Sequence, residues 1–205
     1  MRLRLAVLGD SIGYGTGASR PADTLAQRLA AGLSADGLPV ESRVFAVPGA
    51  QSFDLARQVA QATPWQPDVA VIVIGANDLT NRVPIKRAAA QLGQAVRALR
   101  HHGAQVVVAP TPDISSVPFI PPPMRAALRG ASTQLRRAQA EAVSAEGGRV
   151  ADPQARSVAG FAADRALFSA DGFHPSSAGY AVIADALLPA VREAVSEIRD
   201  IERTG

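Results

Sequence analysis

The fold is decided by the stretch Val-Ala-Val-Ile-Val-Ile at residues 69–74, which is followed at once by Gly-Ala-Asn-Asp at residues 75–78. A continuous apolar run that is rich in β-branched residues is typical of a strand buried on both faces. Such a strand belongs in the middle of a parallel sheet, so we expect it to lie centrally. The polar residues behind it then stand where the strand ends.

Outward from this run, strand and helix signals alternate along the chain. Further strands are predicted at residues 3–8, 40–47, 105–109 and 149–151. Helices are predicted at residues 24–35, 53–62, 85–101 and 123–146, with a last one after Ser177. Inside that last helix, Pro189 is expected to cause a kink or a break. The alternation predicts an α/β fold, a three-layer α/β/α sandwich around a doubly wound, five-stranded parallel sheet.

Composition sets further bounds. With 205 residues, of which 47% are hydrophobic, the chain can bury a full core, and we expect one domain over residues 1–205. Cysteine is absent, which excludes disulfides, thiolate catalysis and cysteine-ligated metals. The formal charge is +3 and the arginines are scattered over predicted helices, which argues against nucleic-acid binding.

The first apolar run, at residues 3–8, bears on localisation. It is interrupted by Arg4 and closed by Asp10. It is too short for the core of a signal peptide and far below the roughly 20 residues of a membrane span. We therefore expect a soluble, cytoplasmic protein without a membrane span, although a signal removed from the chain would leave no trace.

Polar or glycine-rich residues follow each of the first predicted strands. Ser11 follows the first strand, Gly49 the second and Asn77 the third. Ligands bind beyond the carboxyl ends of parallel strands, near the point where strand order reverses, so these residues are expected to meet on one rim. With Asp171 and His174 ahead of the last helix, they supply a hydroxyl, an acid–base pair and oxyanion donors. Acyl transfer from a serine requires these groups.

His174 is one of three histidines. The other two, His101 and His102, lie at a predicted helix end before Gly103, where an imidazole is an ordinary capping device. His174 instead follows Asp171 by three residues in a loop. The carboxylate can hold one ring nitrogen there while the other nitrogen faces the serine.

Asn77 and Gly49 are the candidate oxyanion donors. The side-chain amide of Asn77 can donate to an oxyanion, and glycine at position 49 lets a backbone amide approach the substrate without a side chain in the way. Both residue types are also common in turns, and a lone serine in a glycine-rich turn is usually a cap. Asp10 and Asp78 are expected to be structural and to bind loop amides near the nucleophile.

The chain resembles the SGNH hydrolase superfamily, also called GDSL esterases and lipases. The blocks that carry the resemblance, in the family's order, are Gly9-Asp10-Ser11-Ile12, Pro48-Gly49, Gly75-Ala76-Asn77-Asp78 and Asp171-Gly172-Phe173-His174-Pro175-Ser176. Ile12 stands where the family's name-giving form has leucine. The resemblance implies the flavodoxin-like SGNH fold and an ester-cleaving hydrolase that needs no cofactor and no metal. It assigns Ser11 as nucleophile, His174 as base, Asp171 as its partner, and Gly49, Asn77 and the Ser11 amide as the oxyanion hole.

The substrate is less closely defined, since the family covers carboxylesters, thioesters, lysophospholipids and carbohydrate acetyl esters. Low aromatic content and a single tryptophan, Trp65, argue against a sugar-stacking cleft. The pattern suggests no exposed apolar surface helix that would contact lipid. We favour small, short-chain esters as small-molecule substrates. A carbohydrate acetyl esterase is the alternative, and thioesterase and lysophospholipase activity stay open.

The glycine-rich turn around Ser11 also matches parts of two other motifs. Residues 9–13 fit the Gly-x-Ser-x-Gly elbow of α/β-hydrolases, but that elbow comes after several strands and this one follows the first. A phosphate-binding loop would make the protein a nucleotide- or ligand-binding α/β domain. Residues 13–17 have Gly-x-Gly-x-Gly spacing, however, without the Gly-Lys-Ser/Thr ending, and the second strand has no acidic ribose partner.

The connection at residues 110–123 is unusual because it contains six prolines. These stiffen the backbone and are expected to exclude helix. Val117, Phe119 and Ile120 offer apolar contacts within it. The segment is either a rigid surface connection or a wall or lid of the acyl pocket.

Overall fold

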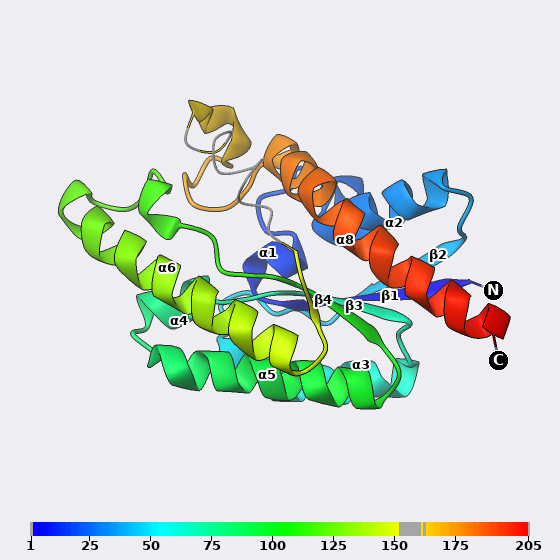
Figure 1. The fold of residues 1–205 in the computed structure, drawn as a ribbon. Helices are drawn as coiled ribbons and strands as arrows, with labels where there is room; N and C mark the ends of the chain where they lie inside the picture. Colours follow the sequence, from blue (N-terminus) through cyan, green and yellow to red (C-terminus); the bar gives the residue numbers. More distant parts are fainter. Residues whose placement is uncertain (1, 152–160, 162, 205) are drawn as a thin grey trace.

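The computed structural model describes residues 2–151, 161 and 163–204. Its centre is a five-stranded parallel sheet with the order β2-β1-β3-β4-β5 (Figure 1). The strands are β1 (Leu3–Gly9), β2 (Val40–Val44), β3 (Val69–Val73), β4 (Gln105–Ala109) and β5 (Arg149–Val150). The apolar run at residues 69–74 thus supplies the central strand, as predicted, and the order is that of a flavodoxin-like sheet.

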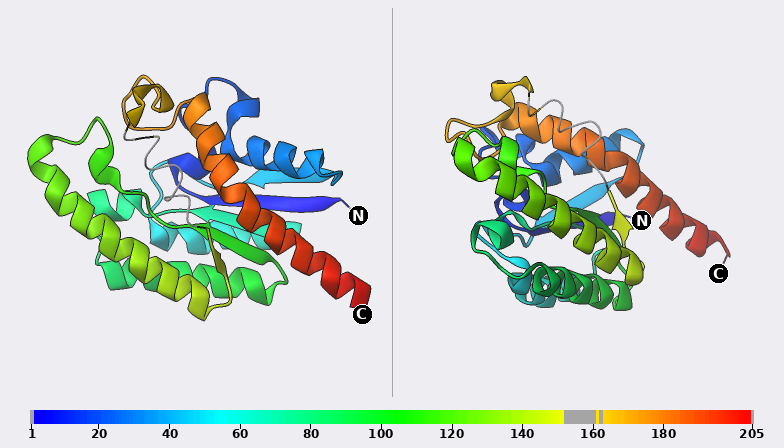
Figure 2. Two further views of the ribbon diagram at one scale, coloured as in Figure 1. Left: turned by 45° about the horizontal axis from the view of Figure 1, so that its top comes forward. Right: turned by 60° about the vertical axis from the view of Figure 1, so that its left-hand side comes forward.

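Helices cover both faces of the sheet, which gives the three layers that the sequence predicts (Figures 1 and 2). On one face lie α2 (Leu25–Ala35) and α8 (Ser177–Thr204). On the other lie α3 (Leu55–Ala62) and α5 (Ile85–His101), with α6 (Pro122–Ala145) packed along α5. Two short helices, α1 (Ser11–Tyr14) and α4 (Ala76–Thr80), begin just behind β1 and β3.

The alternating side chains of the strands divide the interior into two cores. In β1, Leu5 and Val7 pack against α2 and α8, whereas Ala6 and Leu8 pack on the side of α3 and α5. All four side chains are fully buried. Burying one large aliphatic side chain stabilises a fold by about 1.5 to 3 kcal/mol, and a shift of one residue would turn each of these side chains to the other face. The two-sided burial therefore fixes the register of the strands and the rim on which their carboxyl ends meet.

The predicted bounds differ from the observed ones mainly at the second strand. The sequence predicts that this strand reaches residue 47, but β2 ends at Val44. Val44 and Val7 of β1 form the last pair of the ladder between the two strands. Beyond it, the amides of Phe45 and Ala46 both donate to the carbonyl of Val7, which breaks the regular ladder. The chain then turns through residues 45–50 toward the rim. The bounds of α5 and β4 match the prediction at both ends.

The structure differs from two expectations about proline. Of the kink or break expected at Pro189, the break is absent, because α8 continues through this residue. Pro189 is exposed, so water can satisfy the carbonyl that loses its helical partner, while Leu187 and Val191 stay in the core on either side. Helix is also not excluded from residues 110–123, since a 3₁₀ turn forms at Ile114–Ser116 and α6 begins at Pro122. Proline is tolerated there because the first turn of a helix has no backbone acceptor for its amides.

Among the described residues, no helix is both long and apolar enough to cross a membrane.

Candidate active site

Ser11 lies at the carboxyl end of β1, as the first residue of α1. Asp10 caps this helix, because its side chain accepts a hydrogen bond from the Ile12 amide at 3.0 Å. Gly9 just before it has a φ of +125°, and a Cβ there would lie 1.8 Å from the carbonyl oxygen of Val73. Only glycine fits this approach of two backbones, which turns the chain and brings the serine to the rim.

The structure brings Ser11, His174 and Asp171 together. Nε2 of His174 lies 3.1 Å from Oγ of Ser11, and Nδ1 lies 2.6 Å from Oδ2 of Asp171. An ionised carboxylate can only accept, so Nδ1 carries the proton of that bond and Nε2 is left to accept from the serine hydroxyl. Ser11 is 8% exposed and the His174 side chain 20% exposed, so the pair is shielded but reachable.

Asp171 is held by several donors at once. Oδ1 accepts from the Ser169 hydroxyl at 2.7 Å and from the amides of Phe173 and His174 at 2.8 and 2.9 Å. Partial burial raises the pKa of Asp171, but the hydrogen bonds from His174, Phe173 and Ser169 outweigh it and hold the pKa far below its usual value. The carboxylate therefore stays ionised and keeps the imidazole in one orientation.

The loop that carries His174 is closed by its own backbone. The Ser169 amide donates to the His174 carbonyl at 2.8 Å, and Phe168 forms an isolated bridge with Pro175. Ser176 then caps α8, since its hydroxyl accepts from the Gly179 amide at 3.2 Å. The loop is therefore a compact unit at the start of the last helix.

Gly49 lies on the loop behind β2, and Asn77 lies in the first turn of α4, behind β3. The Asn77 side chain donates to the Ala50 carbonyl at 2.9 Å, which uses one of its two N–H groups and joins α4 to that loop. Gly49 has a φ of +82°, and a Cβ would meet no atom within 4 Å. Within the described part of the chain, the backbone amides of Ser11 and Gly49 have no hydrogen-bond acceptor. Amides of this kind are the groups that an oxyanion hole requires.

Asp10 and Asp78 are buried and bind loop donors, as expected from the sequence. Asp78 accepts from the Ser52 amide at 3.1 Å and from the Ser52 hydroxyl at 2.9 Å. Burial raises the pKa of both carboxyl groups, and it raises that of Asp10 to about 7, with a further contribution from the nearby charge of Asp78. Asp10 thus lies next to Ser11 as a carboxyl group whose pKa is raised to about 7.

Gln139 was missed by the sequence analysis. Its side chain is fully buried, accepts from the Thr111 amide at 2.8 Å and donates to the Ile74 carbonyl at 3.0 Å. It therefore joins the ends of β3 and β4 beside the site. A signal was present, because Gln139 stands four residues from both Leu135 and Val143 on the buried face of α6. A polar residue in an apolar stripe usually has a buried partner.

The proline-rich segment contacts the loop that carries His174. The Phe119 amide donates to the Gly172 carbonyl at 3.3 Å, and the Phe119 ring meets Phe173 edge-on at 6.1 Å. Phe173 in turn meets the His174 ring at 4.9 Å. Phe119 is 70% exposed, so it offers an apolar surface beside the triad.

His101 and His102 lie away from these residues. They lie at the end of α5, just before β4 begins, and therefore near the amino-terminal ends of the parallel strands. Ser11 lies beyond the carboxyl ends. Among the described residues, no three histidine, aspartate or glutamate side chains converge as metal ligands do. The groups that meet on this rim are a serine hydroxyl, an imidazole and a carboxylate.

Comparison with known proteins shows to which protein family the chain belongs. Residues 7–182 match the sequence model of the GDSL-like lipase/acylhydrolase family, which is most of the chain. The chain belongs to this family. It is also 38% identical over 208 aligned positions to the GDSL-like esterase Rv1075c of Mycobacterium tuberculosis. That alignment covers 97% of this chain but 65% of the relative, so the chain spans less than two thirds of that protein's length.

Solved structures agree on the fold. TesA superimposes with a TM-score of 0.77 at 20% identity, covering 93% of this chain and 99% of that one. The psychrotrophic esterase EstA from Pseudoalteromonas sp. superimposes with a TM-score of 0.74 at 17% identity, covering 94% and 98%. At these identities the likeness establishes a shared α/β architecture.

Proposed function

We propose that the protein is a serine esterase that hydrolyses small, short-chain carboxylic esters through an acyl-enzyme on Ser11. The observation that carries the proposal is the line of contacts from Ser11 Oγ to His174 Nε2 at 3.1 Å and from His174 Nδ1 to Asp171 at 2.6 Å. Membership of the GDSL-like lipase/acylhydrolase family supports the same reaction class.

In the first step, Ser11 Oγ attacks the ester carbonyl carbon while Nε2 of His174 takes the hydroxyl proton. The resulting imidazolium is stabilised by Asp171, which remains ionised. The carbonyl π electrons move to the oxygen and form a tetrahedral oxyanion. The amides of Ser11 and Gly49 and the second N–H of Asn77 donate to that oxyanion.

In the next step the intermediate collapses. The bond to the alcohol oxygen breaks, His174 returns its proton to that oxygen, and the alcohol leaves with Ser11 acylated. A water molecule then attacks the acyl carbon, again giving its proton to His174, and the carboxylic acid departs as the Ser11 hydroxyl is restored. Each proton that His174 takes is given back within the same half-reaction.

The preference for small esters rests on what surrounds the triad. Phe119, Phe173 and the buried side chains of Ile114, Val117 and Ile120 form an apolar cluster beside His174. This favours an apolar acyl or alcohol group over a polyhydroxyl one. We therefore interpret residues 110–123 as a wall of the substrate site.

Hydrolysis of p-nitrophenyl acetate and butyrate tests the reaction. Ser11→Ala is expected to lose about 10⁴-fold or more in kcat, because the nucleophile is removed while the fold is kept. The matched control is Ser34→Ala, an exposed serine on α2, which is expected to retain full activity. Activity that survives in Ser11→Ala, or an inactive wild-type protein, would contradict the proposal.

A panel of esters is needed to identify the class of substrate that the protein prefers. Aryl esters with acyl chains of 2 to about 12 carbons, acyl-CoA thioesters, a lysophospholipid and an acetylated sugar would be compared by kcat/KM. We expect the short aryl esters to be hydrolysed best. A sharp preference for the acetylated sugar would overturn this choice and identify a carbohydrate acetyl esterase.

A further inference from the structure

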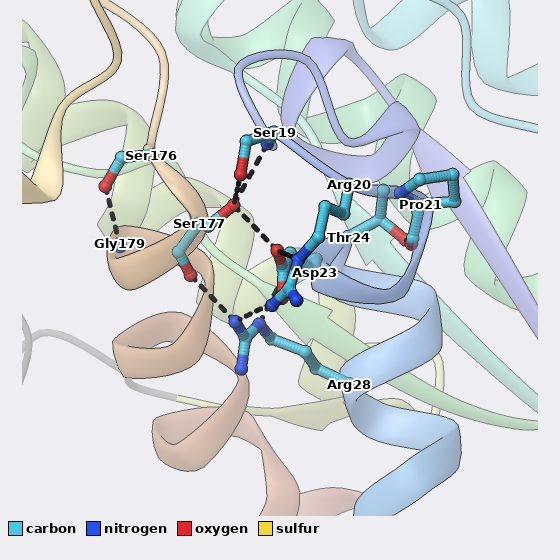
Figure 3. A network of polar contacts seen from close by, with 9 residues as sticks. All are labelled: Ser19, Arg20, Pro21, Asp23, Thr24, Arg28, Ser176, Ser177 and Gly179. Atoms are coloured by element: carbon cyan, nitrogen blue, oxygen red, sulfur yellow. Dashed lines mark hydrogen bonds and ion pairs between the residues drawn. The ribbon is translucent and has the colours of Figure 1, made fainter.

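Besides Asp10 and Asp78, a further buried carboxylate lies in the segment that follows α1 and takes no part in the proposed reaction. Asp23 ends the 3₁₀ turn Pro21–Asp23, between α1 and α2, and is 4% exposed. Its carboxylate accepts from Arg20 at 2.8 and 3.1 Å, from Arg28 at 2.9 Å and from the Ser177 hydroxyl at 3.0 Å (Figure 3). The hydrogen bonds from Arg20 and Ser177 and the charge of Arg28 lower the pKa of Asp23, so it is ionised at neutral pH.

Ser177 is the centre of this network. It is the first residue of α8 and stands three positions after His174. Its hydroxyl donates to Asp23 and accepts from the Ser19 amide at 3.0 Å, and it lies 2.8 Å from the Ser19 hydroxyl. One donor and two acceptor positions are all that a serine hydroxyl has, so the group is fully used. Arg28 also donates to the Ser177 carbonyl at 3.0 Å, as Figure 3 shows.

The two segments that this network joins carry the two reacting groups. Residues 15–24 follow directly on α1, which begins with Ser11, and Ser177 follows directly on the loop of His174. Gly17 touches that loop so closely that a Cβ would lie 2.4 Å from the Pro175 carbonyl and 3.1 Å from the His174 Cβ. The serine turn and the histidine loop are therefore packed directly on each other.

The 3.1 Å contact between Ser11 and His174 depends on this packing. The two residues are 163 positions apart, and the histidine loop lies outside the five-stranded sheet. Its strand-like contact is the local bridge between Phe168 and Pro175, which ties the loop to itself and not to the serine. Misplacing a reacting group by about 1 Å can cost about 100-fold in rate.

We propose that Asp23 and Ser177 are positioning residues that hold the histidine loop against the serine turn and so keep His174 within hydrogen-bond reach of Ser11. The inference rests on the proposed function, since it assumes that Ser11 and His174 react together. Neither Asp23 nor Ser177 touches the triad through its own side chain; they act through the backbone of α8 and of residues 15–24.

The chain provides a matched control for this proposal. Asp36 and Arg192 also join α2 to α8 through an ion pair, at 2.7 and 3.1 Å. Arg192 stands 15 residues beyond Ser177, which is about 22 Å along the helix. Removing this pair loosens the same two helices at the far end. It therefore separates a general effect on stability from an effect on the position of His174.

The test compares Ser177→Ala, Ser177→Thr and Asp36→Ala with the wild type, well below their unfolding temperatures. Two rates are measured: kcat with KM for a short aryl ester, and the rate at which a phosphonylating reagent inactivates the enzyme. Ser177→Ala is expected to lower kcat and the phosphonylation rate by about 10- to 100-fold with little change in KM. Ser177→Thr, which keeps the hydroxyl, is expected to restore both, and Asp36→Ala to leave both unchanged.

Several outcomes would overturn the proposal. These are wild-type rates in Ser177→Ala, failure of Ser177→Thr to restore them, or an equal loss in Asp36→Ala. If Ser177→Ala does not fold, Ser19→Ala decides instead, because it removes one exposed partner of the Ser177 hydroxyl and is expected to lower kcat by a few fold. Ser11→Ala, measured in parallel, separates the proposed function from the positioning role. An active Ser11→Ala would show that Ser11 is not the nucleophile. An inactive Ser11→Ala together with wild-type rates in Ser177→Ala would reject only the positioning role.

Discussion

The side chain of Gln58 closes a pair of hydrogen bonds with the backbone of Gly9. Its oxygen accepts from the Gly9 amide at 2.7 Å, and its nitrogen donates to the Gly9 carbonyl at 2.8 Å. Gly9 is the last residue of β1 and stands two positions before Ser11. A buried carboxamide on α3 thus holds the point where the strand ends and the serine turn begins.

Replacing Gln58 tests that relationship. Gln58→Leu leaves the buried Gly9 amide without its partner, whereas the Gly9 carbonyl keeps the hydrogen bond from the Val47 amide, so the substitution is expected to lower the free energy of unfolding by about 1 to 3 kcal/mol. It should also lower kcat, because the Ser11 turn loses its support. The control is Gln61→Leu, at an exposed position of the same helix, which should change neither. Urea unfolding measures the first quantity, and an unchanged midpoint would contradict the assigned role.

Asn77→Ala tests the oxyanion hole. Loss of one oxyanion donor typically costs about 100- to 1,000-fold in kcat. We expect a fall of this size with little change in KM, because the donor acts on charge that develops in the transition state. Circular dichroism should show an intact fold, since the bond from Asn77 to Ala50 is partly exposed. Near-normal turnover would mean that Asn77 only joins α4 to the loop behind β2.

The raised pKa of Asp10 predicts a pH dependence of stability. The folded state holds this proton up to a pKa of about 7, whereas the unfolded chain releases it near 3.8. The contribution of protonated Asp10 to the free energy of unfolding is therefore fully present below pH 3.8 and is lost as the pH rises through 7. The loss is of the order of a few kcal/mol. Asp10→Asn is expected to remove this slope between about pH 4 and 7.

Urea unfolding over that pH range, with wild type and Asp10→Asn side by side, measures the difference. Asp36→Asn serves as a control of opposite sign. The hydrogen bond from Arg192 lowers the pKa of Asp36, so its contribution is present at neutral pH and is lost as the pH falls. A pH slope that is the same in Asp10→Asn as in the wild type would show that Asp10 is not the titrating group.

Phe119→Ala tests the wall formed by residues 110–123. The side chain is exposed and meets Phe173 beside His174, so its loss should leave the melting temperature nearly unchanged. It should raise KM for aryl esters by a few fold and alter the dependence of kcat/KM on acyl chain length. Phe53→Ala, another exposed phenylalanine, is the control. Identical chain-length profiles for the two variants would favour a plain surface connection.

Much of the architecture follows from local patterns in the sequence. The strands β1, β3 and β4 each carry an apolar signal, and the run at residues 69–74 is continuous because β3 is covered on both sides. The bounds of β2 and of the proline-rich segment were less predictable. The end of β2 depends on its pairing with β1, which ends at the pair Val7 and Val44, and the end of the proline-rich segment depends on Pro122 serving as the first residue of α6. Both are set by neighbouring elements and not by the segment itself.

The sequence by itself determined the alternation of strands and helices, and with it the rim on which Ser11, Asn77 and the Asp171–His174 loop gather, because hydrophobic periodicity and short motifs are local. Only the tertiary structure decided which buried polar groups meet there. Gln58 with Gly9, and Asp23 with Ser177, are pairs separated by 49 and 154 residues. Hydrogen bonds of this kind depend on the final packing of several elements, and no local pattern encodes them.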